Sequence, residues 1–109
     1  MYPSSQTSDF LNKEYHEAFI DGEYIVSSSN EYIDIVNSAN EEVIAKIKVS
    51  NTKDVNQAVS SAKRTFESDE WTKMYPSERQ KLMLKLADLL EENADTLAEI
   101  ITLENGKLV

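Results

Sequence analysis

The stretch PSERQKLMLKLADLLEENADTLAEI, residues 76–100, decides the fold class of this chain. Its apolar residues recur every three or four positions, which is typical of one face of an amphipathic helix. Pro76 stands where a helix can begin without losing a hydrogen bond, and Gly106 stands where a left-handed residue can end one. Because Asn93 interrupts the apolar positions, we expect a bend or break between residues 91 and 95. The apolar positions, called here the leucine face, are Leu82, Leu86, Leu89, Leu90, Ala94, Leu97, Ala98 and Ile101.

The leucine face is large for a chain of this size. Its six large side chains would gain about 9–18 kcal/mol on burial, at roughly 1.5–3 kcal/mol each. The rest of the sequence predicts only a shorter helix and a few short strands, which offer little area to cover it. The face therefore predicts a larger partner, either the rest of a larger domain or a second chain. Packing within this chain alone is the alternative.

A second helix is predicted from Asn51 or Thr52, either of which can cap it, to about Ser68. Asp54 would lie in its first turn, where a carboxylate is favoured by the helix dipole. We expect a loop between the two helices, with Trp71 as its packing anchor. The apolar stripe of this helix consists of Val55, Ala58, Val59, Ala62 and Phe66.

Upstream of residue 51 the pattern is that of strands. The Asp21-Gly22 dipeptide lies within FIDGEYIV, residues 19–26, and is a strong hairpin signal. Alternating and β-branched residues predict further strands over residues 32–36 and 43–49. The prediction is an α+β fold, with a short antiparallel β meander followed by two or three amphipathic helices. Residues 1–18 show no sustained period, so we expect a flexible lead there, distinct from a domain over 19–109.

Composition removes most binding and catalytic classes. The 109 residues include 20 acidic and 11 basic side chains, for a net charge of −9. Nucleic acids and anionic membranes would repel such a chain, and no window is apolar enough to span a bilayer. The sequence shows neither a secretory signal nor an arginine-rich presequence. We therefore expect a cytoplasmic protein, with the mitochondrion as the alternative.

The sequence also lacks the residues that most catalytic sites need. It contains no cysteine and one histidine, His16, which we interpret as incidental despite its neighbour Glu17. Gly22 and Gly106 lie at opposite ends of the chain, so no glycine-rich phosphate loop can form. The acidic pairs at 41–42, 69–70 and 91–92 point apart on helices or turns and predict solvated surface. No catalytic and no cofactor-binding residue is therefore predicted.

Seven short motifs, taken together and in their order along the chain, resemble the amino-terminal stretch of the aldehyde dehydrogenases. Three positions depart from the family pattern, because Ser38, Glu41 and Glu104 stand where the family usually has proline, glycine and aspartate. The motifs are FIDGEY at 19–24, IVNSANEEVIAKI at 35–47, DVNQAV at 54–59, AKRTFES at 62–68, Trp71, the 76–100 stretch and TLENGK at 102–107.

The resemblance implies that residues 19–109 open an α/β, Rossmann-like cofactor-binding domain. It implies a parent enzyme that oxidises aldehydes to carboxylic acids with NAD or NADP. The family's catalytic and cofactor-phosphate segments come later than these residues, so the chain alone is expected to be inactive. The leucine face would be covered by the rest of the fold or by a second copy of the chain. The alternative is a small acidic interaction module that docks through the leucine face, and the coding sequence beyond Val109 would distinguish the two.

The resemblance also implies a site for a monovalent cation. Its ligands would be the backbone carbonyls of Ile35 and Val36 and the carboxylate of Glu104. Hard oxygen ligands suit such an ion. Because glutamate is one methylene longer than the family's aspartate, we expect the site to be weak. The alternative is that Glu104 is an ordinary carboxylate at a helix end.

Overall fold

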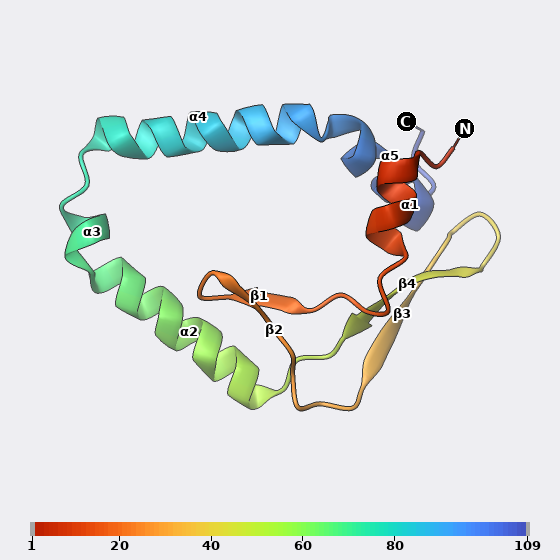
Figure 1. Ribbon diagram of the computed structural model, residues 1–109, viewed down its shortest axis with the longest axis horizontal. Coiled ribbons are helices and arrows are strands. Elements are labelled where there is room, and N and C mark those ends of the chain that lie inside the picture. The colour runs from red at the N-terminus through yellow and green to blue at the C-terminus, as the bar shows by residue number, and fades with distance from the viewer. Residues whose placement is uncertain (1, 109) are drawn as a thin grey trace.

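The computed structural model describes residues 2–108 and contains strand pairs followed by helices (Figure 1). This confirms the predicted fold class. In chain order the elements are α1 (Ser5–Leu11), β1 (Ala18–Ile20), β2 (Glu23–Ile25), β3 (Tyr32–Val36), β4 (Val43–Lys48), α2 (Thr52–Glu67), α3 (Asp69–Thr72), α4 (Pro76–Glu92) and α5 (Ala94–Asn105).

The strands form two separate antiparallel pairs, β1–β2 and β3–β4, rather than one continuous meander. The polar connector between β2 and β3 explains the separation. The Ser27 hydroxyl donates to the carboxylate of Asp54, and the Asn51 side-chain amide donates to Ser28 Oγ at 2.8 Å. These bonds hold the connector at the start of α2, so β2 and β3 do not pair. The predicted Asp21-Gly22 turn is confirmed, with φ of 56° and 81°.

The predicted ends of α2 and α5 are confirmed. Asn51 caps α2 through a capping box: its side chain accepts from the Asp54 N–H at 3.1 Å, and the Asp54 carboxylate accepts from the Asn51 N–H at 2.8 Å. The break in the long apolar stretch falls at Asn93, between α4 and α5. Gly106 ends α5 with a φ of 72°.

The region around Trp71 differs from the prediction in two respects. Trp71 lies in the short helix α3 rather than in a loop, because Ser68 caps that turn. The Arg79 guanidinium lies 4.5 Å from the centroid of the Trp71 ring and donates a hydrogen bond to the Trp71 backbone carbonyl at 2.6 Å. These contacts agree with the predicted role of Trp71 as a packing anchor. At the start of α4, the Glu78 carboxylate accepts from the Tyr75 N–H at 2.9 Å. This bond, which is half of a capping box, assists Pro76 in starting the helix.

The amino-terminal residues contain an element without a periodic signal in the sequence. Residues 5–11 form α1, capped by the Ser4 side chain, which accepts from the Thr7 N–H. α1 packs against α5, at the other end of the chain (Figure 1). The structure therefore places a helix within the predicted lead, and both the flexibility of residues 1–18 and the division of the chain at residue 18 stay predictions.

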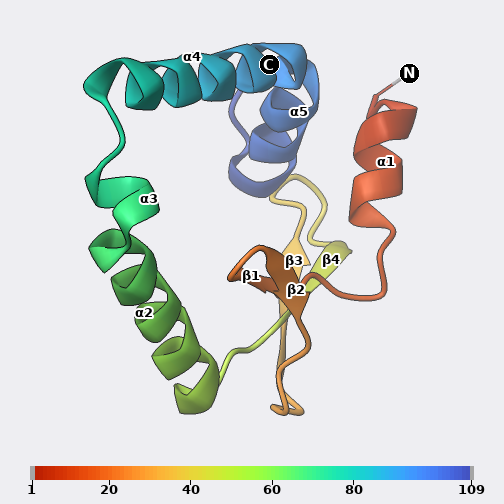
Figure 2. The same ribbon diagram turned by 60° about the vertical axis from the view of Figure 1, so that its left-hand side comes forward.

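The chain is more open than a compact domain. Its radius of gyration is 17.3 Å, against about 13 Å for a compact chain of this length. Its accessible surface is 8648 Å², against roughly 6100 Å² for a folded monomer of this mass. Helices α3 and α4 arch away from the strands, whereas α2 contacts β1 (Figures 1 and 2). Along the leucine face the large side chains remain between 40% and 52% exposed. No helix within residues 2–108 has the length and apolar character needed to cross a membrane.

Candidate functional site

The turn after β3 lies against the end of α5. The Ser38 backbone N–H and hydroxyl both donate to the carbonyl of Leu103, at 2.9 and 3.3 Å. Ile35 and Glu104, two of the three residues predicted for the cation site, line the same cavity beside this contact. Val36 does not line it, because successive strand residues face opposite sides. The structure thus brings the two segments together, and cation binding stays a prediction.

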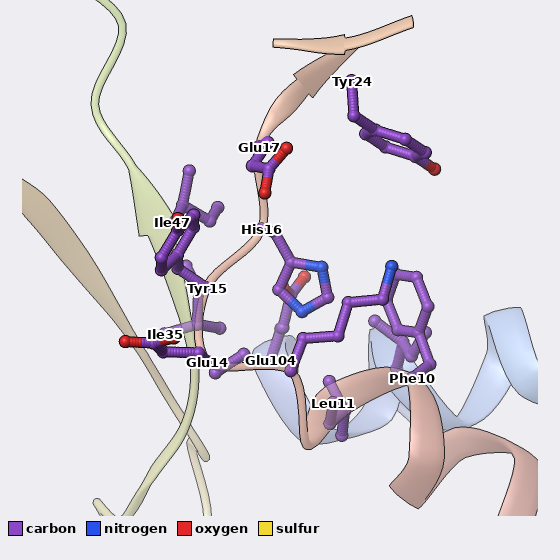
Figure 3. Close-up of a pocket in the computed structure, with 13 residues that line it drawn as sticks. Phe10, Leu11, Glu14, Tyr15, His16, Glu17, Tyr24, Ile35, Ile47 and Glu104 are labelled. Atoms are coloured by element: carbon purple, nitrogen blue, oxygen red, sulfur yellow. The ribbon is translucent and has the colours of Figure 1, made fainter. Parts of the chain in front are cut away.

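That cavity, called here the arm cavity, has a volume of about 700 Å³ (Figure 3). One wall is the amino-terminal arm, residues 4–17. The opposite side comes from the β3–β4 pair and α5, and Tyr24 of β2 closes one end. The lining residues are Phe10, Leu11, Lys13, Glu14, Tyr15, His16, Glu17, Tyr24, Ile35, Ala45, Ile47, Ile100 and Glu104.

One end of the arm is fixed to α5 by Glu99. The Glu99 carboxylate accepts hydrogen bonds from the Ser4 N–H at 3.0 Å, from the Ser4 hydroxyl at 2.8 Å and from the Thr7 hydroxyl. Thr7 is fully buried. The bonds from Thr7 and Ser4 stabilise the ionised form and lower the pKa of Glu99. The arm is therefore held by a partly buried, charge-assisted contact as well as by packing.

The other end of the arm is fixed to β4. The His16 N–H donates to the Lys46 carbonyl at 2.7 Å, and the Lys48 N–H donates to the His16 carbonyl at 2.9 Å. His16 pairs in parallel with Ile47, on the side of β4 away from β3. The two anchors hold residues 10–17 over the sheet, which creates the arm cavity.

The His16 side chain faces the cavity (Figure 3). Its ring centroid lies 4.8 Å from that of Phe10, and Nε2 is buried without a hydrogen-bond partner among the described residues. Burial lowers the pKa of His16, and the positive charge of Lys13 lowers it further. Both effects favour the neutral form of the imidazole. The interpretation of His16 as incidental missed its backbone pairing and its place in the cavity wall.

Glu99 and Thr7 were not among the residues predicted from the sequence. The available signal was the Ser4-x-x-Thr7 spacing, a helix-capping pattern followed by the apolar pair at 10–11. Glu99 itself carried no signal, because its partners lie more than 90 positions away.

Neither glycine of this chain lies in a phosphate-binding loop. Gly22 occupies a hairpin turn and Gly106 a helix end, so neither belongs to a loop whose N–H groups could cradle a pyrophosphate. The three acidic pairs are exposed, as predicted. Within residues 2–108, no group of three or more His, Asp or Glu side chains could hold a metal ion.

Comparison with known proteins identifies the class. The model of the aldehyde dehydrogenase family matches residues 24–109. Phenylacetaldehyde dehydrogenase of Pseudomonas fluorescens is 39% identical over 94 residues, which are 86% of this chain and 19% of that protein. Mitochondrial 10-formyltetrahydrofolate dehydrogenase of Homo sapiens is 36% identical over 105 residues, 96% of this chain and 11% of that protein. The chain belongs to the aldehyde dehydrogenase family.

Solved structures agree with this assignment. A variant of aldehyde dehydrogenase from Bacillus cereus superposes with a TM-score of 0.90 at 34% identity, over 98% of this chain and 22% of that one. Betaine aldehyde dehydrogenase from Staphylococcus aureus, in complex with NAD+, superposes with a TM-score of 0.85 at 33% identity, over 94% of this chain and 20% of that one. The chain thus spans about a fifth of the length of the solved relatives it matches.

Proposed function

We propose that this chain is the amino-terminal part of the cofactor-binding domain of an NAD(P)-dependent aldehyde dehydrogenase, whose parent enzyme oxidises aldehydes to carboxylic acids. One observation carries the proposal. The chain superposes closely on about a fifth of such an enzyme, yet its leucine face is exposed. The remaining four-fifths of the fold would supply the surface that covers this face.

The contribution of this chain to the parent enzyme is structural. The parent reaction forms a thiohemiacetal on a cysteine and passes a hydride to the nicotinamide, and this chain has no cysteine. It also has no phosphate loop. Its helices α2 and α4 instead present apolar surface on which the dinucleotide-binding sheet can pack.

A second candidate function uses the same surface. The exposed leucine face also suits a small acidic module that docks on another protein. The partner would be a full-length relative or a second copy of the chain. In this case the chain would bind without contributing to catalysis.

Co-expression separates the two functions. The chain is expressed with the Bacillus cereus enzyme from which the matching amino-terminal segment has been deleted. Restored NAD+ reduction with an aldehyde supports the catalytic-domain proposal, whereas association without activity supports the binding module. The Leu86→Gln/Leu90→Gln variant should abolish either result, because it makes the leucine face polar where the partner would bind. If the chain neither restores activity nor associates, both proposals are wrong.

A further inference from the structure

The charges around the arm cavity favour a cationic occupant. Three of its lining residues are acidic, Glu14, Glu17 and Glu104, against one basic residue, Lys13. Burial disfavours a positive charge on the His16 imidazole. Opposite charge attracts a ligand into a partly enclosed site and like charge repels it. An anionic ligand is therefore disfavoured.

The lining does not suit a bare divalent metal ion. The described residues offer no converging set of acidic or histidine side chains that could chelate one. The rest of the lining is largely aliphatic or aromatic, with Ile35, Ala45, Ile47 and Ile100 on the side of the sheet and α5. A volume of about 700 Å³ lies within the usual range of small-molecule sites, about 300–1,000 Å³. The cavity thus suits an organic molecule.

The chain itself shows where a cationic nitrogen can lie. The ammonium of Lys13 lies 5.8 Å from the centroid of the Phe10 ring and 5.4 Å from that of the Tyr24 ring. Both distances allow a cation–π attraction. The ion pairs within residues 2–108 do not include Lys13. Two aromatic rings, rather than a carboxylate, therefore hold this ammonium at the cavity.

We propose that the arm cavity binds an organic ammonium ion that carries an apolar substituent. Its nitrogen takes the place of the Lys13 ammonium between Phe10 and Tyr24, and its substituent packs on Ile35 and Ile47. The cavity is built from the arm, the strands and α5 of this chain, so the proposal does not depend on the catalytic function of a parent enzyme.

His16 provides a direct reporter, because it is the only histidine in the chain. Its imidazole proton signals can be followed by NMR while the purified chain is titrated with benzyltrimethylammonium chloride. Benzyl alcohol serves as the neutral aromatic control, and potassium chloride controls for ionic strength. We expect a saturable shift for the ammonium compound, with a dissociation constant at least about tenfold below that of benzyl alcohol, since only the cation gains the attraction of the rings and carboxylates.

Two pairs of variants make the test specific. Tyr24→Leu should weaken binding about two- to thirtyfold, because it removes one aromatic face. Tyr75→Leu makes the same change at an exposed tyrosine away from the cavity and should leave binding unchanged. Lys13→Gln should tighten binding, since it removes the competing ammonium. Lys81→Gln, the same change on α4, should not.

Several results would overturn the proposal. They are a shift that never saturates, an equal response to benzyl alcohol or to potassium, and equal effects of the two tyrosine variants. A His16 signal at its random-coil position that no probe moves would also overturn it, because the cavity would then be absent from the chain in solution.

Discussion

The hydroxyl of Thr7 donates a hydrogen bond to the carboxylate of Glu99, a residue 92 positions further along the chain. Thr7 is fully buried by this contact. The bond joins the first helix to the last, so residues outside the family-model match at 24–109 are part of the fold.

Replacing Thr7 with valine should release α1. Valine keeps the shape of the side chain but removes the donor, and a hydrogen bond to a charged group contributes about 1.5–3 kcal/mol. We expect amide hydrogen exchange over residues 5–11 to accelerate by about tenfold or more. Thr102→Val is the matched control. The Thr102 hydroxyl is buried with no partner among the described residues, so its removal should be neutral or stabilising. Equal acceleration in both variants would contradict the role given to Thr7.

The structure should weaken in acid. Hydrogen bonds lower the pKa of three carboxyl groups. Ser27 and Asn51 lower the pKa of Asp54. Thr7 and Ser4 lower the pKa of Glu99, and Ser61 and Arg64 lower that of Asp21. A pKa that is lower in the folded than in the unfolded chain adds stability above the unfolded pKa. That stability is lost as the pH falls through the folded value. Circular dichroism should therefore show a stable chain above about pH 5 and progressive unfolding below the ordinary pKa values of 3.8 for aspartate and 4.5 for glutamate.

Asp54→Asn tests this linkage at one site. The variant should be less stable near neutral pH, and its stability should depend less steeply on pH below 4. Asp88→Asn is the matched control, because Asp88 is exposed and takes part in none of the side-chain hydrogen bonds of residues 2–108. A wild-type chain whose unfolding does not depend on pH would show that these carboxylates do not stabilise the fold.

The leucine face should make the isolated chain associate or fluctuate. Leu86 is 49% exposed and Leu90 is 52% exposed. Replacing both with glutamine should raise solubility and shift light scattering toward the monomer mass, at little cost in folded structure. Leu103 is buried, at 7% exposure, so Leu103→Ala should lower the free energy of unfolding by about 2–5 kcal/mol. A monomeric wild type with a sharp transition that the double variant loses would show that this face is an internal core.

The isolated chain should not oxidise aldehydes. It has no cysteine, so the covalent route to a hydride-donating intermediate is closed. Purified chain given NAD+ or NADP+ and a panel of aldehydes should produce no reduced nicotinamide above the buffer rate. Turnover that follows the chain through successive purification steps would contradict this.

Any monovalent cation should bind weakly at Ile35, Val36 and Glu104. The site offers two carbonyls and one long carboxylate, which are few ligands for such an ion. Thermal melts in potassium, sodium and caesium chloride at equal ionic strength should agree closely. A shift of many degrees specific to one of these ions would overturn the prediction.

Local signals in the sequence were enough to place most helices. Asn51, Pro76, Asn93 and Gly106 act on the backbone within a few residues, and the structure begins, breaks or ends a helix at each of them. The open shape was also predictable, because the leucine face exceeds what this chain can cover. These features depend on propensity and periodicity, which neighbouring residues determine.

The arm cavity could not be predicted in the same way. Its walls depend on Glu99 reaching Ser4 and on His16 pairing with β4, and both contacts join segments far apart in sequence. Residue 16 pairs through its backbone, so its side chain gives no sign of the contact. The separation of β2 from β3 was missed for a related reason, since it results from the bond between Ser27 and Asp54.

The pairing of His16 with β4 bears on how this chain is trimmed for expression. A chain shortened to the family match at 24–109 would lose residue 16 and leave the Lys46 carbonyl and the Lys48 N–H without their partners. It would also lose β1 and leave β2 unpaired. Open strand edges recruit strands from other molecules and promote aggregation. His16 and β1 therefore protect two strand edges, and a boundary placed at the start of the family-model match would expose both.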